Sequence, residues 1–338
     1  MSKKNKTLTV LFQNNKKRLS TIYYRYIFLI IISLTILVGV LFYKLDAHIA
    51  LFGDTPSALG EYVKTVATVL GGALVLLGLW INNRRVAEQI RQNNIAEKGQ
   101  INTRFKDAAT LLGSENVSSI LSGVYALHQI ASESSVGDEI QKGYVRIIHD
   151  ILCAYVRENT ETIVKEDDGR EWRVNSKPTI VIQTIIKVLF KNNEFIYSDL
   201  MTDLSNCIFE DTDFDNAYIA NVDFSKTKFI RSTANNCSFV SCYLENTFID
   251  EVNFSGSSFD KVVFDNSHIK NSSLAESKLS ECDFWDVILY KTTFEKAKME
   301  KIDFKNAIFE EDVIFSDTAL AGFTLDEIAK DSLNMTKA

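Results

Sequence analysis

The segment TDLSNCIFEDTDFDNAYIANVDF occupies residues 202–224 and starts a repeat of five residues that continues to residue 309 without insertion or deletion. Every fifth residue, counted from Leu204, is apolar, and Ala234 is the only small one among these 22 central positions. Phe fills 12 of them. A second series lies two residues before each central position and contains only Ala, Cys, Ser, Thr and Val, apart from Ile302. No other position in the five is restricted in this way.

A strict period of five excludes the ordinary secondary structures. An amphipathic helix needs a period of 3.6 residues and a half-buried strand needs a period of two. A short repeat that cannot bury its own apolar residue becomes stable by stacking on copies of itself. The period therefore predicts a solenoid in which the large residue fills the axis and the small residue fits beside it.

Four triplets carry a resemblance to the pentapeptide-repeat family, whose motif places a small residue and often Asp before a central Leu or Phe. They are Thr202-Asp203-Leu204, Val222-Asp223-Phe224, Cys282-Asp283-Phe284 and Ile302-Asp303-Phe304. The resemblance implies a right-handed quadrilateral β-helix with four repeats in each coil. Residues 199–311 would then form the solenoid, about 26 Å long at roughly 4.8 Å for each coil. The preference for Phe makes the interior tight, so enlarging a residue of the small series should destabilise it.

Two hydrophobic segments near the start of the chain indicate membrane helices. Residues 26–43 contain no charge and are long enough to cross a bilayer. Residues 65–82 are also uncharged, at the short end of the range, and the alternative for them is a buried helix of a globular domain. With residues 44–64 as a short external loop, these segments predict a two-helix transmembrane anchor, for which the lipid bilayer is a partner.

The distribution of lysine and arginine sets the expected orientation of this anchor. Residues 1–25 contain seven basic residues and no acidic residue, and three arginines follow the second segment. The loop between the segments contains only two lysines, against three acidic residues. Because positive charge accumulates on the cytoplasmic side, we expect both termini in the cytoplasm and the protein in a bacterial inner membrane.

Residues 83–193 are predicted to form an α-helical cytoplasmic domain. A charged helix should end near Gly113, and apolar residues then recur at helical spacing around Val124 and Ile148. This part resembles the helical segment found between membrane helices and pentapeptide repeats in many bacterial proteins. Residues 312–338 are expected to form a C-terminal tail, with a short helix opened by a capping box at Thr324.

Nothing in the sequence indicates catalysis or cofactor binding. None of the four histidines has a second histidine or a cysteine at metal-ligand spacing, and there is no phosphate-binding loop or nucleophile motif. Four of the five cysteines belong to the small series, where a thiol packs as a compact apolar group. We therefore expect no enzyme activity, no catalytic or metal-binding residues, no cofactor and no small-molecule ligand.

The outward-pointing residues of the solenoid are the best candidates for a functional surface. Folding the repeat into four faces gathers six apolar residues on one side, with Val263 and Trp285 around the adjacent corner. The six are Ile208, Ile230, Phe248, Ile288, Tyr290 and Ile308. Such a patch marks a contact surface. It is either covered internally, by the helical domain or the tail, or it binds an unidentified protein partner or a second copy of the chain.

These patterns predict a membrane-anchored, non-enzymatic scaffold for protein–protein interaction, an architecture compatible with a role in defence or stress. The alternative comes from charge. Soluble pentapeptide-repeat proteins that protect DNA gyrase are acidic rods that imitate DNA, and residues 202–311 contain 20 acidic and 11 basic residues. The lysines interrupt the acidic surface, whereas a mimic of DNA phosphates needs nearly unbroken negative charge. We do not expect nucleic acid as a ligand.

Overall fold

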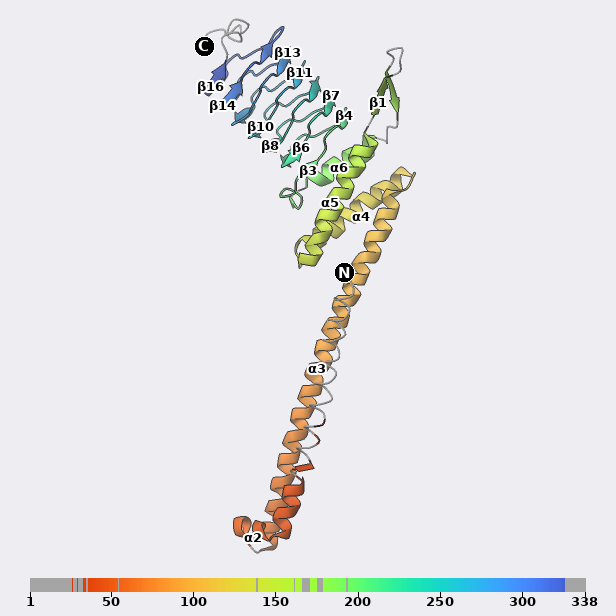
Figure 1. Cartoon of the computed structure of the whole chain (residues 1–338), viewed down its shortest axis with the longest axis vertical. Helices are drawn as coiled ribbons and strands as arrows, with labels where there is room; N and C mark the ends of the chain where they lie inside the picture. Colours follow the sequence, from red (N-terminus) through yellow and green to blue (C-terminus); the bar gives the residue numbers. More distant parts are fainter. Residues whose placement is uncertain are drawn as a thin grey trace, which may run out of the picture. The chain divides into compact units, whose positions relative to one another are not determined.

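The structure is a computed structural model that describes residues 26, 29, 33, 34, 36–53, 55–137, 139–160, 162–165, 171–174, 179–192 and 194–325 (Figure 1). It divides into two compact units, residues 1–98 and 99–338, and the division falls within helix α3. The expected tail helix after Thr324 lies outside the described residues, as does the whole basic segment 1–25.

The first unit is helical. Residues 36–44 form a helical segment, followed by α2 (Ala47–Phe52) and α3 (Pro56–Leu112). Of the described helices, α3 is the one long and apolar enough to cross a membrane, with an 18-residue window of mean hydropathy 1.8 that is not buried. The hydroxyl of Tyr62 donates a hydrogen bond to the carbonyl oxygen of Gly39, so α3 packs against the preceding helical segment.

The boundaries of this unit differ from those expected. The chain turns into α3 at Pro56, inside the stretch expected as an external loop (44–64), because proline is favoured in the first turn of a helix. The second hydrophobic segment and the charged helix after it form one continuous helix of 57 residues, about 85 Å long at 1.5 Å for each residue.

The described part of the second unit begins with helices that pack against one another. Helices α4 (Val117–Ser135), α5 (Glu139–Asn159) and α6 (Thr179–Phe190) correspond to the apolar patterns of the sequence. A two-stranded antiparallel hairpin, β1 (Thr162–Lys165) and β2 (Glu171–Val174), occupies a polar stretch for which no strand was expected. The side chain of Asn116 accepts a hydrogen bond from the amide of Ser119 and so caps α4.

Short strands follow at a spacing set by the five-residue repeat and form a β-solenoid of about six turns (Figure 1). One sheet, the β9 sheet, contains β4 (Ile208–Glu210), β7 (Lys228–Ile230), β9 (Phe248–Asp250), β11 (His268–Lys270), β13 (Ile288–Tyr290) and β15 (Ile308–Phe309). A second sheet, the β10 sheet, contains β5 (Tyr218–Ala220), β8 (Ser238–Val240), β10 (Ser258–Asp260), β12 (Lys278–Ser280), β14 (Lys298–Phe304) and β16 (Ala319–Leu325).

The register confirms the predicted coil of four repeats. Neighbouring strands are parallel and pair residues 20 positions apart, as Phe229 pairs with Ile249. Two further faces are held by parallel bridges, one through Thr233 and Asn253. The other, the aspartate face, starts with the pair β3 (Thr202–Asp203) and β6 (Val222–Asp223) and continues by bridges to Asp303.

Both restricted series point into the solenoid as the sequence predicts. All 22 central residues are buried, and so are all 22 residues of the small series. Phenylalanines stack along the axis from coil to coil, with ring centroids of Phe264 and Phe284 4.5 Å apart. Buried hydroxyls and thiols of the small series bond to main-chain oxygens of the preceding coil, as Ser257 does to Ala234 at 2.6 Å.

A third position of the repeat is also restricted, and sequence analysis missed it. The residue two positions after each central residue adopts a left-handed backbone, with φ near 55° at Asn236 and Lys296. From Asn206 to Asn306 this position holds only polar residues or Gly, and never a β-branched residue. Branched side chains are disfavoured at positive φ, so this position makes each of the four corners.

The solenoid extends beyond its expected end at residue 311. Ile314 bridges to Thr293 and β16 pairs with β14, both at a spacing of 21 residues instead of 20. One extra residue is therefore inserted after Phe309, and Phe315 restores the interior stack on Phe294 with centroids 4.9 Å apart. The interruption of the period at this point hid the final coil from an argument based on a strict repeat.

Candidate protein interface

The β9 sheet carries the six apolar residues that were expected to gather on one side. Ile208, Phe248, Ile288 and Ile308 belong to one ladder of outward positions, while Ile230 and Tyr290 belong to the neighbouring ladder. We call this outward surface the β9 face. Six of its 12 outward positions in residues 208–310 are apolar, compared with three of 12 on the aspartate face.

The apolar residues of the β9 face are accessible but do not form an unbroken patch. Ile308 is 52% exposed, and the other five are half-buried. Lys228 lies between Ile208 and Phe248 in the ladder, and His268 lies between Phe248 and Ile288. The face therefore has an apolar group at each end and a mixed centre.

Charged side chains cover part of the aromatic surface. The ammonium group of Lys270 lies 4.8 Å from the centroid of the Phe248 ring and 3.1 Å from a carboxylate oxygen of Asp250. Lys291 lies 5.0 Å from the centroid of the Tyr290 ring. Such cation–π contacts contribute a modest energy at exposed sites, so a partner must displace or accommodate two lysines.

Trp285 does not share the β9 face. It follows the bridge between Val263 and Asp283 on the aspartate face and is 40% exposed. The ammonium group of Lys305, one coil further along, lies 5.1 Å from the centroid of its ring. Trp285 is therefore separated from the six residues by a corner of the solenoid, as its position in the repeat indicates.

The helical domain contacts the first coil of the solenoid, at the end of the rod. The imidazole Nε2 of His149 lies 2.8 Å from the hydroxyl of Thr202, and Arg157 pairs with Asp203. The hydrophobic core continues from α4, α5 and α6 into the first coils without interruption. The described contacts between residues 149–198 and the solenoid include hydrogen bonds and ring contacts at Thr202, Asp203, Asp213, Tyr218 and Asn221.

The side chain of Gln183, in α6, closes the open edge of the first coil. Its side-chain amide donates to the carbonyl oxygen of Asp213 at 2.6 Å and accepts from the amide of the same residue at 2.9 Å. These two bonds replace the strand that a preceding coil would have supplied. Lys191 adds an ion pair to the Asp213 carboxylate at 2.7 Å. These contacts of the described residues lie on the faces of Asp203 and Asp213.

The buried histidines and cysteines of the second unit are uncharged near pH 7, as expected for side chains that pack in a core. Burial lowers the pKa of His149 and of His128, so both imidazoles are neutral near pH 7. Burial raises the pKa of the Cys153 thiol to about 12 and that of Cys242 to about 11, which removes the thiolate needed for reactivity. All five cysteines are free and buried, and the described residues contain no cluster of three or more potential metal ligands.

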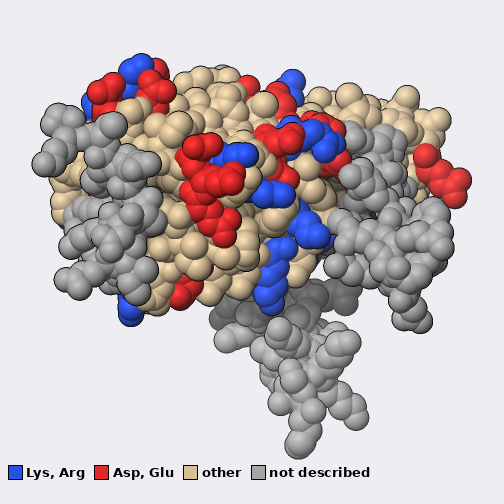
Figure 2. Space-filling model, turned by 90° about the horizontal axis from the view of Figure 1, so that it is seen from above, with Lys and Arg blue, Asp and Glu red and all other residues tan. Residues whose placement is uncertain are grey.

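Charge is unevenly distributed over the solenoid. Figure 2 shows acidic and basic side chains beside one another on the surface seen from above. The outward and corner positions of the aspartate face contain seven acidic and two basic residues. Burial, followed by the repulsion of Asp303, raises the pKa of Asp283. On the β9 face, in contrast, Arg231, Lys270 and Lys291 are paired with carboxylates of the same or the adjacent coil.

The parallel coils define a β-solenoid built from five-residue repeats. A family model for pentapeptide repeats matches residues 202–233, 237–274 and 267–306, in eight copies. The solenoid of this chain is therefore a pentapeptide-repeat domain. A search of curated proteins gives no match.

Solved structures that match part of this chain include two pentapeptide-repeat proteins and one fluoroquinolone resistance protein. HetL from the cyanobacterium Nostoc sp. strain PCC 7120, involved in heterocyst differentiation regulation, is 12% identical over 38% of this chain and 63% of its own, with a TM-score of 0.23. Rfr23 from the cyanobacterium Cyanothece 51142 is 13% identical over 40% and 95%, with a TM-score of 0.21. QnrB1, a plasmid-mediated fluoroquinolone resistance protein, is 13% identical over 39% and 80%, with a TM-score of 0.15. These values support no inference about activity.

Proposed function

We propose that this protein is a membrane-anchored, non-enzymatic scaffold that uses the β9 face of its solenoid to bind another protein in the bacterial cytoplasm. The observation that carries the proposal is the concentration of accessible apolar residues on one sheet. Half of the outward positions of the β9 face are apolar, while the contacts of the helical domain lie at the end of the rod. An accessible face of this composition is typical of a protein contact surface.

The membrane part of the proposal is supported by composition. The apolar window of α3 and the uncharged residues 26–43 provide two segments of membrane-spanning character. The lysines and arginines at their flanks favour an orientation with both termini in the cytoplasm. A bacterial inner membrane would then hold the scaffold close to the lipid surface and raise the local concentration of any partner bound there.

The scaffold proposal is tested by affinity purification from solubilised membranes. The full-length chain should recover a specific protein that a chain ending at residue 192, without the solenoid, does not recover. Recovery of the same proteins by both forms would contradict a role for the solenoid in binding.

A DNA-mimicking, gyrase-interacting protein is the second candidate, and the aspartate face favours it. Among the described residues Asp223, Asp283 and Asp303 have no ion pair, and they lie on the most acidic face. Replacing these three aspartates by asparagine should abolish a salt-sensitive interaction with gyrase if mimicry is the function. If the scaffold proposal holds, the same triple substitution should leave recovery of the partner unchanged.

A further inference from the structure

We infer that the occupant of the β9 face is an amphipathic α-helix of the partner protein, lying along the axis of the solenoid. This inference rests on the proposed function, because it specifies the shape and charge of the partner that the same face would bind. It follows from the spacing of the outward side chains and from the order of apolar and charged residues along them.

The spacing of the outward side chains fits a helix better than an extended strand. Each ladder of the β9 face presents one residue in each coil, about 4.8 Å apart, so Ile208, Phe248 and Ile288 follow one another at about 9.6 Å. A helix rises about 5.4 Å in each turn and 10.5 Å in seven residues. A helix lying along the ladder would therefore place a side chain near every second coil, since the two intervals differ by only about 0.9 Å.

An extended strand does not match these positions. Its side chains point to the same side every second residue, about 6.6 Å apart, and this interval falls out of step with 4.8 and 9.6 Å within two coils. The grooves between apolar side chains of neighbouring coils would then face backbone instead of side chains. A helix with apolar residues at intervals of three or four would fill a groove at each turn.

The order of charges along the β9 face specifies the pattern of the helix. Apolar residues lie at both ends, and Lys228 and His268 lie towards the centre beside Phe248. The positive charge of Lys270 is already paired with Asp250, whereas Lys228 has no acidic partner among the described residues. The complementary helix therefore carries apolar residues near its two ends and a carboxylate opposite Lys228.

The length of the face sets the length of the helix. Ile208 and Ile308 are five coils apart, about 24 Å along the axis. A helix lying along the ladder needs about 16 residues to cover this distance. Such a helix has about 4.4 turns, so the face fits one whole amphipathic helix.

Site-specific photocrosslinking in the full-length chain tests the inference. A benzophenone amino acid is introduced singly at Ile208, Phe248 or Ile288, and the crosslinked residues of the captured protein are mapped by mass spectrometry. A helix predicts crosslinks about seven residues further along the partner sequence for each 9.6 Å step. An extended strand predicts about three residues for each step. The same probe at Ser238, on the β10 sheet, should not capture this protein.

The outcomes separate the inference from the proposed function. Intervals of about seven residues support the helix, while intervals of about three, or crosslinks on separate segments of the partner, contradict it and leave the scaffold proposal intact. Absence of adducts at all three positions contradicts both. Lys228→Glu should reduce the adduct yield at Phe248 several-fold, and Lys278→Glu on the β10 sheet should not. An unchanged yield with Lys228→Glu would contradict the expected carboxylate of the helix.

Discussion

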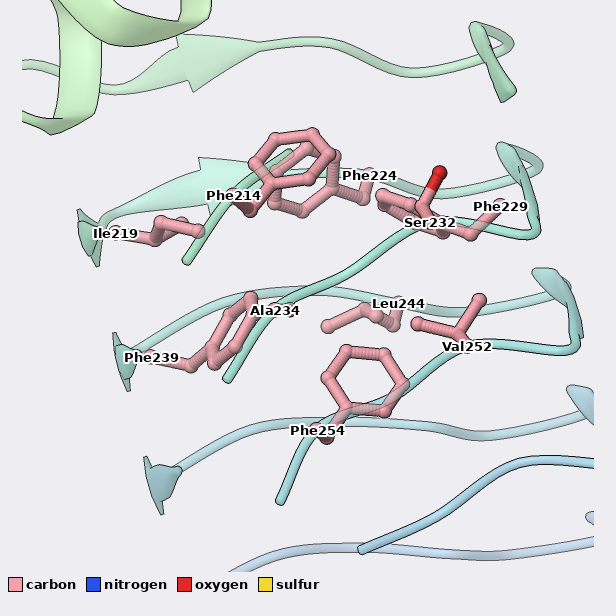
Figure 3. A pocket seen from close by; sticks show the side chains of 10 residues that line it. All are labelled: Phe214, Ile219, Phe224, Phe229, Ser232, Ala234, Phe239, Leu244, Val252 and Phe254. Carbon is pink, nitrogen blue, oxygen red and sulfur yellow. The ribbon is translucent and has the colours of Figure 1, made fainter. Parts of the chain in front are cut away.

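Ala234 provides a quantitative test of how the solenoid interior is packed. It is the only small residue among the central positions, and it lies between Phe214 and Phe254 of the neighbouring coils. The interior holds an apolar cavity of about 10 Å³ there (Figure 3), at the lower limit of the space that a water molecule needs. The hydroxyl of Ser232, the one polar lining group, is already bonded to the main-chain oxygens of Phe209 and Ile230.

The size of this cavity decides which substitution at position 234 is stabilising. Ala234→Cys adds one buried atom, which should contribute about 0.8 kcal/mol, the value for a buried methylene group. Ala234→Phe restores the commonest residue of the repeat but adds a whole ring, so overpacking should destabilise the solenoid by about 1–3 kcal/mol. Leu274→Ala, at the equivalent position two coils further along, calibrates the measurement with an expected loss of about 2–5 kcal/mol.

The assay is thermal unfolding of the full-length chain in detergent, followed by circular dichroism and by hydrogen exchange of the coils around residue 234. We expect Ala234→Cys to unfold at the highest temperature, the unchanged chain at an intermediate temperature and Ala234→Phe at the lowest. If Ala234→Phe is the most stable of the three, the neighbouring rings do not fill the coil in the way the structure places them, and the packing argument is refuted.

Three further predictions concern other parts of the molecule. The pKa of buried His149 is lowered in the folded state, so the unfolded chain binds more protons below about pH 6.5, and the free energy of unfolding should fall from pH 7 to pH 5. In equilibrium unfolding, His149→Gln should weaken this pH dependence. An identical pH profile of the variant would contradict the role of His149. In a chain without its native cysteines, a cysteine at Ser57 should react with an impermeant reagent in intact spheroplasts and one at Ser2 should not, and equal labelling would exclude the proposed orientation. Deleting residues 243–262 removes one coil and should leave a cooperatively folded solenoid, whereas deleting only the first two of them shifts every later central residue out of register; equal loss of structure in thermal unfolding would contradict the coil of four repeats.

The solenoid was predictable from the sequence because a period of five has few structural solutions. The apolar and small series identify every interior residue from Leu204 to Phe309, and the structure buries all of them. The final coil was not predictable in the same way, because the extra residue before Phe315 breaks the period while the three-dimensional pairing continues. The corner position, occupied by residues such as Asn236, was visible in the sequence as an absence of β-branched residues, but its meaning depends on a backbone angle.

The closure of the first coil was not predictable from local patterns. Gln183 belongs to a helical segment, and nothing around it in the sequence indicates that its side-chain amide would bond to the backbone of Asp213. The β9 face was predictable to the extent that residues 20 apart stack, which places Phe248 and Ile288 on one side. The cation–π contact between Lys270 and Phe248 depends on side-chain conformation, so the sequence could not predict it.

The most direct test of the central claim replaces three of the six apolar residues of the β9 face without changing its charge. Ile208, Phe248 and Ile288 are replaced together by serine, which already occupies outward strand positions such as Ser258. The control chain carries the same change at three apolar outward residues of other faces, Val240, Tyr243 and Val263. Both chains are compared with the unchanged protein in affinity purification from solubilised membranes, with thermal unfolding as a check on folding.

The account predicts that the triple substitution on the β9 face abolishes recovery of the partner. The control chain should still recover the partner. Both chains should unfold at the same temperature, because outward residues contribute little to the interior. Equal recovery of the partner by all three chains would contradict the claim that the β9 face is the binding surface.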